Sequence, residues 1–378
     1  MNAKYLFLTT LSTLAVGLIA VTALPFILLF ATGPSADQRA ETLLTSNEAA
    51  WEDRGNTVAA LHAANPEFDL MWRTFTVLAA CDRAIAYPEE ADRWLALADA
   101  MIRDTHAVAT TRGQRHFLLG YADRQDWRQP DAGSLFVDGE IALMVNARRL
   151  VKDAPWLADL GQVWTAKVER DFALAGERLP ESYPNEAWAF CITNALLALH
   201  MSDVVDGTDH SAFIHTTTTH MATDLTDPAT GLLGSDWEVD GTPLDGTEGS
   251  SLWWVSTGLL VLNPELATRQ YQGAHDSLIG GLPGMAWSRE WPGEAHPSDI
   301  DSGPIIPFFE ASPASSGFAL IAASAHGDTR TRRKFVRAIR AADVLLRVDP
   351  RLSQMAEAPM GDAIITFGLG FGPLWARI

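Results

Sequence analysis

Apolar residues recur every three to four positions through most of the chain beyond residue 37. Spacing at i, i+3, i+4 and i+7 puts apolar side chains on one side of a helix, so this pattern predicts amphipathic helices. About twelve are expected, over 39–63, 68–86, 90–109, 135–152, 157–176, 186–205, 208–223, 250–261, 264–278, 309–326, 330–346 and 360–376. Breaker pairs such as Asn65-Pro66 and Asp349-Pro350 separate them. Strand signals are few, and 231–241 is the best candidate for a short extended turn.

Twelve helices correspond to six helical hairpins. No period repeats cleanly and no low-complexity linker divides residues 37–378, so they are expected to form one domain. We therefore predict an all-α fold, an (α/α)6 barrel of helical hairpins, with a helical bundle or a solenoid as alternatives.

An uncharged, strongly apolar run over residues 5–32 precedes this body. A bilayer core needs about 20 helical residues, and the run exceeds the ~7–15 apolar residues of a cleavable signal peptide. We therefore predict one transmembrane helix, with residues 1–36 as membrane anchor and short linker. Lys4 precedes the run and Asp37 follows it, which places the body on the extracytoplasmic side of a single-pass membrane protein.

The composition excludes several classes of function. With 28 Lys+Arg against 47 Asp+Glu and a net charge of −19, the chain lacks the basic residues that neutralise phosphates in nucleic acids. The same acidity argues against binding of the body to anionic lipid through a basic patch. Two cysteines cannot form a disulfide framework or a four-thiolate zinc site.

Sequence motifs for cofactors are missing as well. The chain has no glycine-rich phosphate loop and no Gly-x-Ser-x-Gly nucleophile motif. His215 and His220 are five positions apart, which differs from the four-residue spacing of helical metal ligands. We therefore expect no cofactor and no metal.

Long connections between the helices are the best places for a site. They are rich in Trp, Gly, Asp and Glu and span 110–134, 177–186, 227–249 and 280–308. Long loops in a compact domain usually carry function.

Carboxylates stand at two of these positions. Asp138 and Glu140 stand at the start of a predicted helix. Asp138 suits a capping role, whereas Glu140 lies on the apolar stripe, where burial of a carboxylate is costly and therefore suggests a function. Asp299 and Asp301 precede Gly303-Pro304, which cannot lie inside a helix. Glu140, Asp299 and Asp301 are catalytic candidates; capping acids and a solvated acidic loop are the alternatives.

Two further helix starts combine polar and aromatic side chains. Their candidate residues are Ser182, Tyr183, Asn185, Glu186, Trp188 and Cys191 in the first, and Glu248, Trp253 and Trp254 in the second. The alternatives are a capping role for the carboxylates and a small buried hydrophobe for Cys191. Carboxylates, aromatic rings and one thiol suit acid–base chemistry on a neutral substrate without a cofactor.

Several blocks of the sequence resemble bacterial proteins with a linalool dehydratase/isomerase-like domain. The blocks are 65–75, 135–150, 181–191, 224–234, 248–254 and 299–304. The resemblance extends over most of 40–376 and implies an (α/α)6 barrel that dehydrates and isomerises small monoterpene alcohols without a cofactor.

The resemblance also assigns site positions. The second active-site cysteine of the family corresponds to Cys191 and the first to Ser182. The catalytic histidine corresponds to Glu140, and a tyrosine of the pocket falls near Asp236. A carboxylate thus replaces the acid–base histidine, and a hydroxyl replaces one thiol.

We expect a cofactor-independent lyase or isomerase that acts on a small hydroxylated, terpenoid-like molecule in the barrel mouth. Glu140 would exchange a proton with the departing hydroxyl, Asp299 or Asp301 would be the counterpart base, and Trp188 and Trp253 would form apolar walls.

Two other classes stay open. A glycoside hydrolase or polysaccharide lyase would use paired carboxylates and tryptophan platforms. A non-enzymatic, membrane-tethered binding protein would need neither. The expected partners are the small molecule and, through residues 5–32, the membrane; a homo-oligomer is left open.

Overall fold

The computed structural model describes residues 34–293, 302–348 and 359–378. The predicted membrane segment 5–32 and the candidates Asp299 and Asp301 lie outside these residues. The described chain is mostly helical, with four short strands, which confirms the predicted all-α class.

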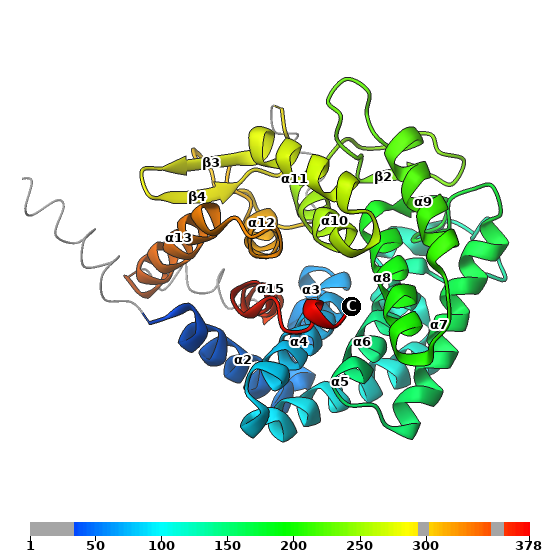
Figure 1. The fold of residues 1–378 in the computed structure, drawn as a ribbon, viewed down its shortest axis with the longest axis horizontal. Helices are drawn as coiled ribbons and strands as arrows, with labels where there is room; N and C mark the ends of the chain where they lie inside the picture. The colour runs from blue at the N-terminus through cyan, green and yellow to red at the C-terminus, as the bar shows by residue number, and fades with distance from the viewer. Residues whose placement is uncertain (1–33, 294–301, 349–358) are drawn as a thin grey trace, which may run out of the picture.

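Six helices contact one another in a closed cycle at the centre of the molecule (Figure 1). In cyclic order they are α4 (Glu67–Ala86), α6 (Leu135–Val151), α8 (Ala189–Asp206), α10 (Gly249–Leu262), α12 (Pro313–Ala325) and α15 (Pro359–Gly370), with α15 returning to α4. Most side chains of α6 and α8 are buried. An enclosed helix is mainly apolar on all sides, and the polar residues that α6 buries, such as Glu140 and Arg149, need partners there.

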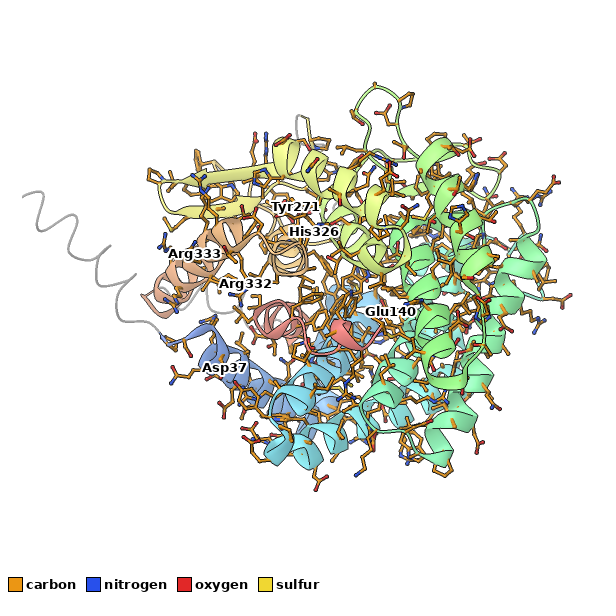
Figure 2. All side chains as sticks on the ribbon, in the orientation of Figure 1. Asp37, Glu140, Tyr271, His326, Arg332 and Arg333 are labelled. Carbon is orange, nitrogen blue, oxygen red and sulfur yellow. The ribbon has the colours of Figure 1, made fainter. Side chains whose placement is uncertain are left out.

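Outer helices pack around the inner ones, and some of them contact two neighbouring inner helices. The outer helices are α5 (Ala91–Arg112) mainly on α4, α7 (Pro155–Ala175) mainly on α6, α9 (Ser211–Asp224) on α8 and α10, α11 (Pro264–Leu278) on α10, α13 (Thr329–Val348) on α12 and α2 (Ala36–Glu52) on α15. Figure 2 shows Glu140 inside the ring, whereas Asp37 and Arg333 lie on outer helices.

One predicted helix is two in the structure. The segment 39–63 is divided into α2 and α3 (Arg54–Ala64), because the chain turns at Asp53. Asp53 is the C-cap of α2, where its backbone N–H donates to the carbonyl of Ala49. Its side chain accepts a hydrogen bond from Asn56 in the first turn of α3. The short helix α3 connects α2 with α4.

Short elements complete the connections. Strands β1 (Glu186–Trp188) and β2 (Asp236–Glu238) pair antiparallel, and β3 (Ile279–Leu282) and β4 (Met285–Ser288) form a hairpin whose turn has Gly284 at φ +86°. The 3-10 helices are η1 (Pro88–Glu90), η2 (Gln114–Phe117), η3 (Gly120–Arg124) and η4 (Trp375–Arg377). β2 lies in the segment 231–241 that was expected to be extended.

Aromatic rings fill the middle of the ring of helices. Phe75 of α4 packs edge-on against Trp254 of α10 and Phe318 of α12, with centroids 5.1 and 5.3 Å away. Phe367 of α15 closes the group at 6.2 Å from Phe75. The middle of the ring of helices is therefore filled by side chains.

Among the described residues, α8 is long and apolar enough to cross a membrane by length and composition. However, 72% of it is buried inside the structure, where it contacts α6 and α10. Its apolar character is explained by that packing.

Candidate functional site

A cavity of about 90 Å³ opens where the inner helices begin. Its wall is mainly aromatic and aliphatic, with two carboxylates, a phenol, a thiol and three serines. The lining residues are Glu67, Phe68, Met71, Phe136, Tyr183, Trp188, Phe190, Cys191, Glu248, Ser250, Ser251, Ser302, Ala314, Phe318 and Met360.

All six inner helices contribute to this wall from their N-terminal turns. Glu67 begins α4, Cys191 is the third residue of α8, and Glu248 is the N-cap of α10. Helix N-termini carry exposed N–H groups and a partial positive charge. These helix starts therefore favour carboxylates in the wall of the cavity.

The wall includes a hydrogen-bonded pair from distant parts of the chain. The Tyr183 hydroxyl donates to Glu67 Oε1 and accepts from the backbone N of Leu119 at 3.0 Å. Tyr121 stacks on Tyr183 at 5.0 Å, and its own hydroxyl donates to Glu186 at 2.8 Å. Burial, followed by the charge of Glu67, raises the pKa of Tyr183, so the phenol stays a proton donor.

Glu248 faces Glu67 from the other side of the ring, since α10 and α4 are three helices apart in either direction. The carboxylate is 7% exposed. Its position is fixed by its own backbone N, which donates to Ser235 Oγ at 2.9 Å. The cavity thus has two carboxyl groups on opposite walls.

Cys191 lies in the wall, and both cysteines are free thiols. Burial raises the pKa of the Cys191 thiol above its ordinary value, and the charges of Glu67 and Glu140 raise it further. The thiol is therefore neutral near pH 7. Cys81 is fully buried in α4 and does not line the cavity.

Glu140 does not line the cavity. It lies one helical turn after Phe136 of the wall and is 0% exposed. Asn194 Nδ2 donates to Oε1 at 3.0 Å, and Trp254 Nε1 in turn donates to Asn194 Oδ1. The hydroxyl of Thr74 on α4 lies beside the carboxyl as a second hydrogen-bonding group. Burial raises the pKa of Glu140 from 4.5 to about 8, so the carboxyl is protonated at neutral pH.

Ser182, Asn185 and Asp236 lie outside the lining of the cavity. Ser182 Oγ accepts from the backbone N of Trp188 at 3.3 Å, and Asn185 Oδ1 accepts from Arg128 at 3.1 Å. Asp236 Oδ1 holds the backbone N of Asp245 at 3.0 Å.

Glu186 and Trp253 also lie outside the lining. Glu186 is on β1, where burial raises its pKa and Tyr121 binds it. Trp253 of α10 is buried, and its Nε1 donates to Ser288 Oγ at 2.8 Å. Of the predicted residues that the structure describes, Tyr183, Trp188, Cys191 and Glu248 line the cavity.

Two carboxylates near the cavity were not among the sequence candidates. Glu67 stands in the first turn of α4, where it looks like a capping acid. Glu290 is buried beside the wall and accepts from Ser250 N at 2.9 Å, Ser250 Oγ at 2.5 Å and Ser312 Oγ. It thereby fixes the starts of α10 and α12. The serines around 312–316 were the sequence signal for this close packing.

Among the described residues, one group of side chains has the ligand types and the spacing of a metal site: His62, Asp69 and His116. It lies outside the lining of the cavity.

No protein-family model matches the chain, and no curated protein matches it either. The functional interpretation consequently depends on the geometry.

Proposed function

We propose that the fold is an (α/α)6 barrel and that the chain is a divergent, membrane-anchored protein of the linalool dehydratase/isomerase-like group. The closed cycle of six inner helices, each with an outer partner, supports the barrel. The cavity at their common N-terminal end is where such a barrel would hold a substrate. Helix pairs joined by long loops at one end bring distant residues together there.

The proposed activity is cofactor-independent removal of water from, or isomerisation of, a small hydroxylated hydrophobic molecule. The observation that carries it is the pair of opposed carboxyl groups, Glu67 with its Tyr183 hydrogen bond and Glu248, in an aromatic cavity. The volume of about 90 Å³ is far below the ~300–1,000 Å³ of sites for drug-sized ligands, which favours a small substrate.

Proton transfer in this proposal uses the wall rather than Glu140, whose carboxyl lies behind it. Glu248 donates its proton to the substrate hydroxyl, the C–O bond breaks and water leaves. Glu67, whose ionised form is favoured by the Tyr183 hydrogen bond, takes a proton from the adjacent carbon and the alkene forms. Exchange with solvent then removes the proton from Glu67 and returns one to Glu248, which restores the starting state.

Aromatic side chains suit this chemistry because loss of a hydroxyl leaves positive charge on carbon. Trp188, Phe190 and Phe318 border the cavity, and ring faces attract a cation. The protonated state of Glu140 at neutral pH keeps a further negative charge away from Cys191 and Glu67.

Opposed carboxylates beside Trp188 also fit a glycosidase, which is the second candidate. The small volume argues against an oligosaccharide. The third class, a binding protein, would hold a ligand in the same cavity and leave it unchanged.

For the location, we propose that residues 5–32 anchor the body to a membrane. The described chain begins at Pro34, whose carbonyl accepts a hydrogen bond from Arg340 of α13.

The test uses the full chain in detergent. It is incubated with tertiary and allylic alcohols of five to ten carbons and, separately, with oligosaccharides. We expect alkenes or isomeric alcohols by gas chromatography–mass spectrometry and no new reducing ends. New reducing ends would favour the glycosidase, and saturable binding without any product would favour the binding protein.

A further inference from the structure

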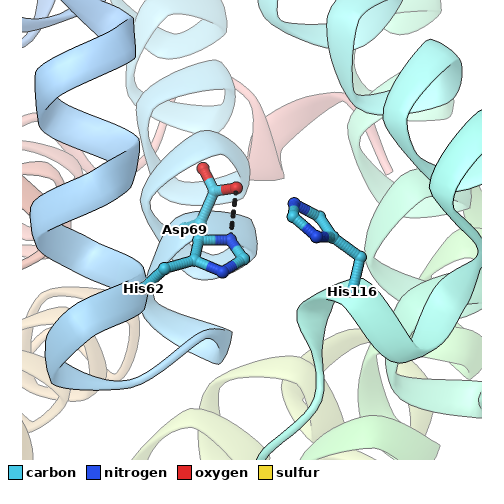
Figure 3. A group of neighbouring side chains, drawn as sticks. All are labelled: His62, Asp69 and His116. Carbon is cyan, nitrogen blue, oxygen red and sulfur yellow. Dashed lines mark hydrogen bonds and ion pairs between the residues drawn. The ribbon is translucent and has the colours of Figure 1, made fainter.

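Two imidazoles and a carboxylate from separate segments meet outside the cavity. His62 is on α3, Asp69 is in the first turns of α4, and His116 is on η2 (Figure 3). One ligand atom from each lies within 4.8 Å of the others. The two imidazole rings are 4.4 Å apart with an interplanar angle of 33°.

The distances suit a metal with short bonds to nitrogen and oxygen. Zinc binds His nitrogen and carboxylate oxygen at about 2.0–2.2 Å, so a tetrahedral angle separates two such ligands by roughly 3.3–3.5 Å. His62 Nε2 and Asp69 Oδ2 are 3.2 Å apart. A ligand atom at the 4.8 Å limit has to approach by roughly 1.3–1.5 Å to reach that tetrahedral separation, which a side-chain rotation can supply.

The carboxylate is already held as metal ligands usually are. Asp69 is fully buried, and its second oxygen, Oδ1, accepts from Arg73 Nε at 2.7 Å. A partner on the outer oxygen fixes the carboxylate and leaves Oδ2 for the ion. Arg73 also binds Asp104 at 2.7 Å, so its charge is neutralised by a carboxylate other than Asp69.

The ligand set selects the class of ion and leaves it an entry path. Imidazole with one carboxylate suits zinc and its first-row neighbours, whereas calcium and magnesium prefer oxygen ligands alone. The His62 side chain is 21% exposed, and His116 is half-buried. Three protein ligands with access to solvent leave one position for water.

We propose that His62, Asp69 and His116 bind one divalent transition-metal ion, with zinc as the best match.

The ion would link the segment between α5 and α6, residues 113–134, to the wall of the cavity. Asp69 is two residues after Glu67, and His116 is three residues before Leu119, whose N–H binds Tyr183. Metal binding would therefore fix α3, α4 and η2 together and hold both partners of the Glu67–Tyr183 pair in place. The metal site itself does not depend on the proposed reaction.

The test measures the metal directly. Full-length protein in detergent is stripped with a chelator and titrated with Zn²⁺ by calorimetry and with Co²⁺ by visible absorption. We expect one equivalent bound, the d–d spectrum of low-coordinate Co²⁺, and a higher melting temperature with Zn²⁺. His62→Gln and His116→Gln should each weaken binding at least tenfold.

The control is His220→Gln, which removes a histidine from an exposed pair with Asp224 on α9. It should bind Zn²⁺ as the unaltered chain does. Absence of a one-equivalent transition, or equal affinity in all three variants, would overturn the proposal. Because His62 and His116 are on different elements, either variant suffices if circular dichroism shows the other to be unfolded.

Discussion

Glu140→Gln should make the protein more stable in mild alkali while leaving its stability in acid almost unchanged. The side chain is completely buried, and glutamine can keep the hydrogen bond that Asn194 donates to Oε1 at 3.0 Å. The substitution removes the ability to ionise, and the amide N–H that it adds can donate to the hydroxyl of Thr74 beside it.

The magnitude follows from the pKa. Burial raises it from 4.5 to about 8 in the folded chain. Between these values the folded chain keeps a proton that the unfolded chain has released, so stability falls as the pH rises. At ~1.4 kcal/mol per pKa unit the loss approaches roughly 4–5 kcal/mol, which is an upper limit. The glutamine variant avoids this loss.

The assay is thermal and urea unfolding of the full chain and the variant in the same detergent, at pH 5 and pH 8.5. The two proteins should be nearly equally stable at pH 5, and the variant should be more stable by a few kcal/mol at pH 8.5. Glu265→Gln, on the exposed side of α11, is the control and should show no such difference. An equal effect of Glu140→Gln at both pH values would refute the reasoning.

Three further predictions concern packing, charge and the anchor. Gly258→Ala should cost about 1–3 kcal/mol of unfolding free energy, because a methyl group there would overlap side chains of α8, whereas Gly55→Ala has open space and should not destabilise. Arg149→Met should cost about 2–3 kcal/mol, because the buried guanidinium binds Asp206 of α8 and Asp153 in the connection after α6; Arg269→Met, at an exposed pair, should change stability by less than ~1 kcal/mol. Removal of residues 1–36 should give a mostly helical protein that needs no detergent; a largely β circular dichroism spectrum or continued need for detergent would contradict this.

The apolar spacing predicted most helices well because inner and outer helices both bury a stripe. The expected 68–86 corresponds to α4, Glu67–Ala86, and 135–152 corresponds to α6. The division at Asp53 was missed, because apolar positions continue on both sides of the turn.

Depth along a helix was harder to predict than the buried face. Phe136 and Glu140 share one side of α6, and the spacing cannot tell which of them reaches the cavity. Glu67 resembled an ordinary acid in a first turn, and only ring closure brings Tyr183 to it from 116 positions away. His62, Asp69 and His116 come from three segments and form no local motif.

The most direct test of the proposed site is Glu67→Gln in the full-length chain, with an alcohol that the unaltered protein converts. We expect product formation to fall at least a hundredfold while binding of the alcohol changes little, because Tyr183 can still donate to the amide oxygen. Glu89→Gln, in η1 and away from the cavity, should leave the rate unchanged. Full activity in Glu67→Gln would contradict the assignment of this cavity as the place of proton transfer.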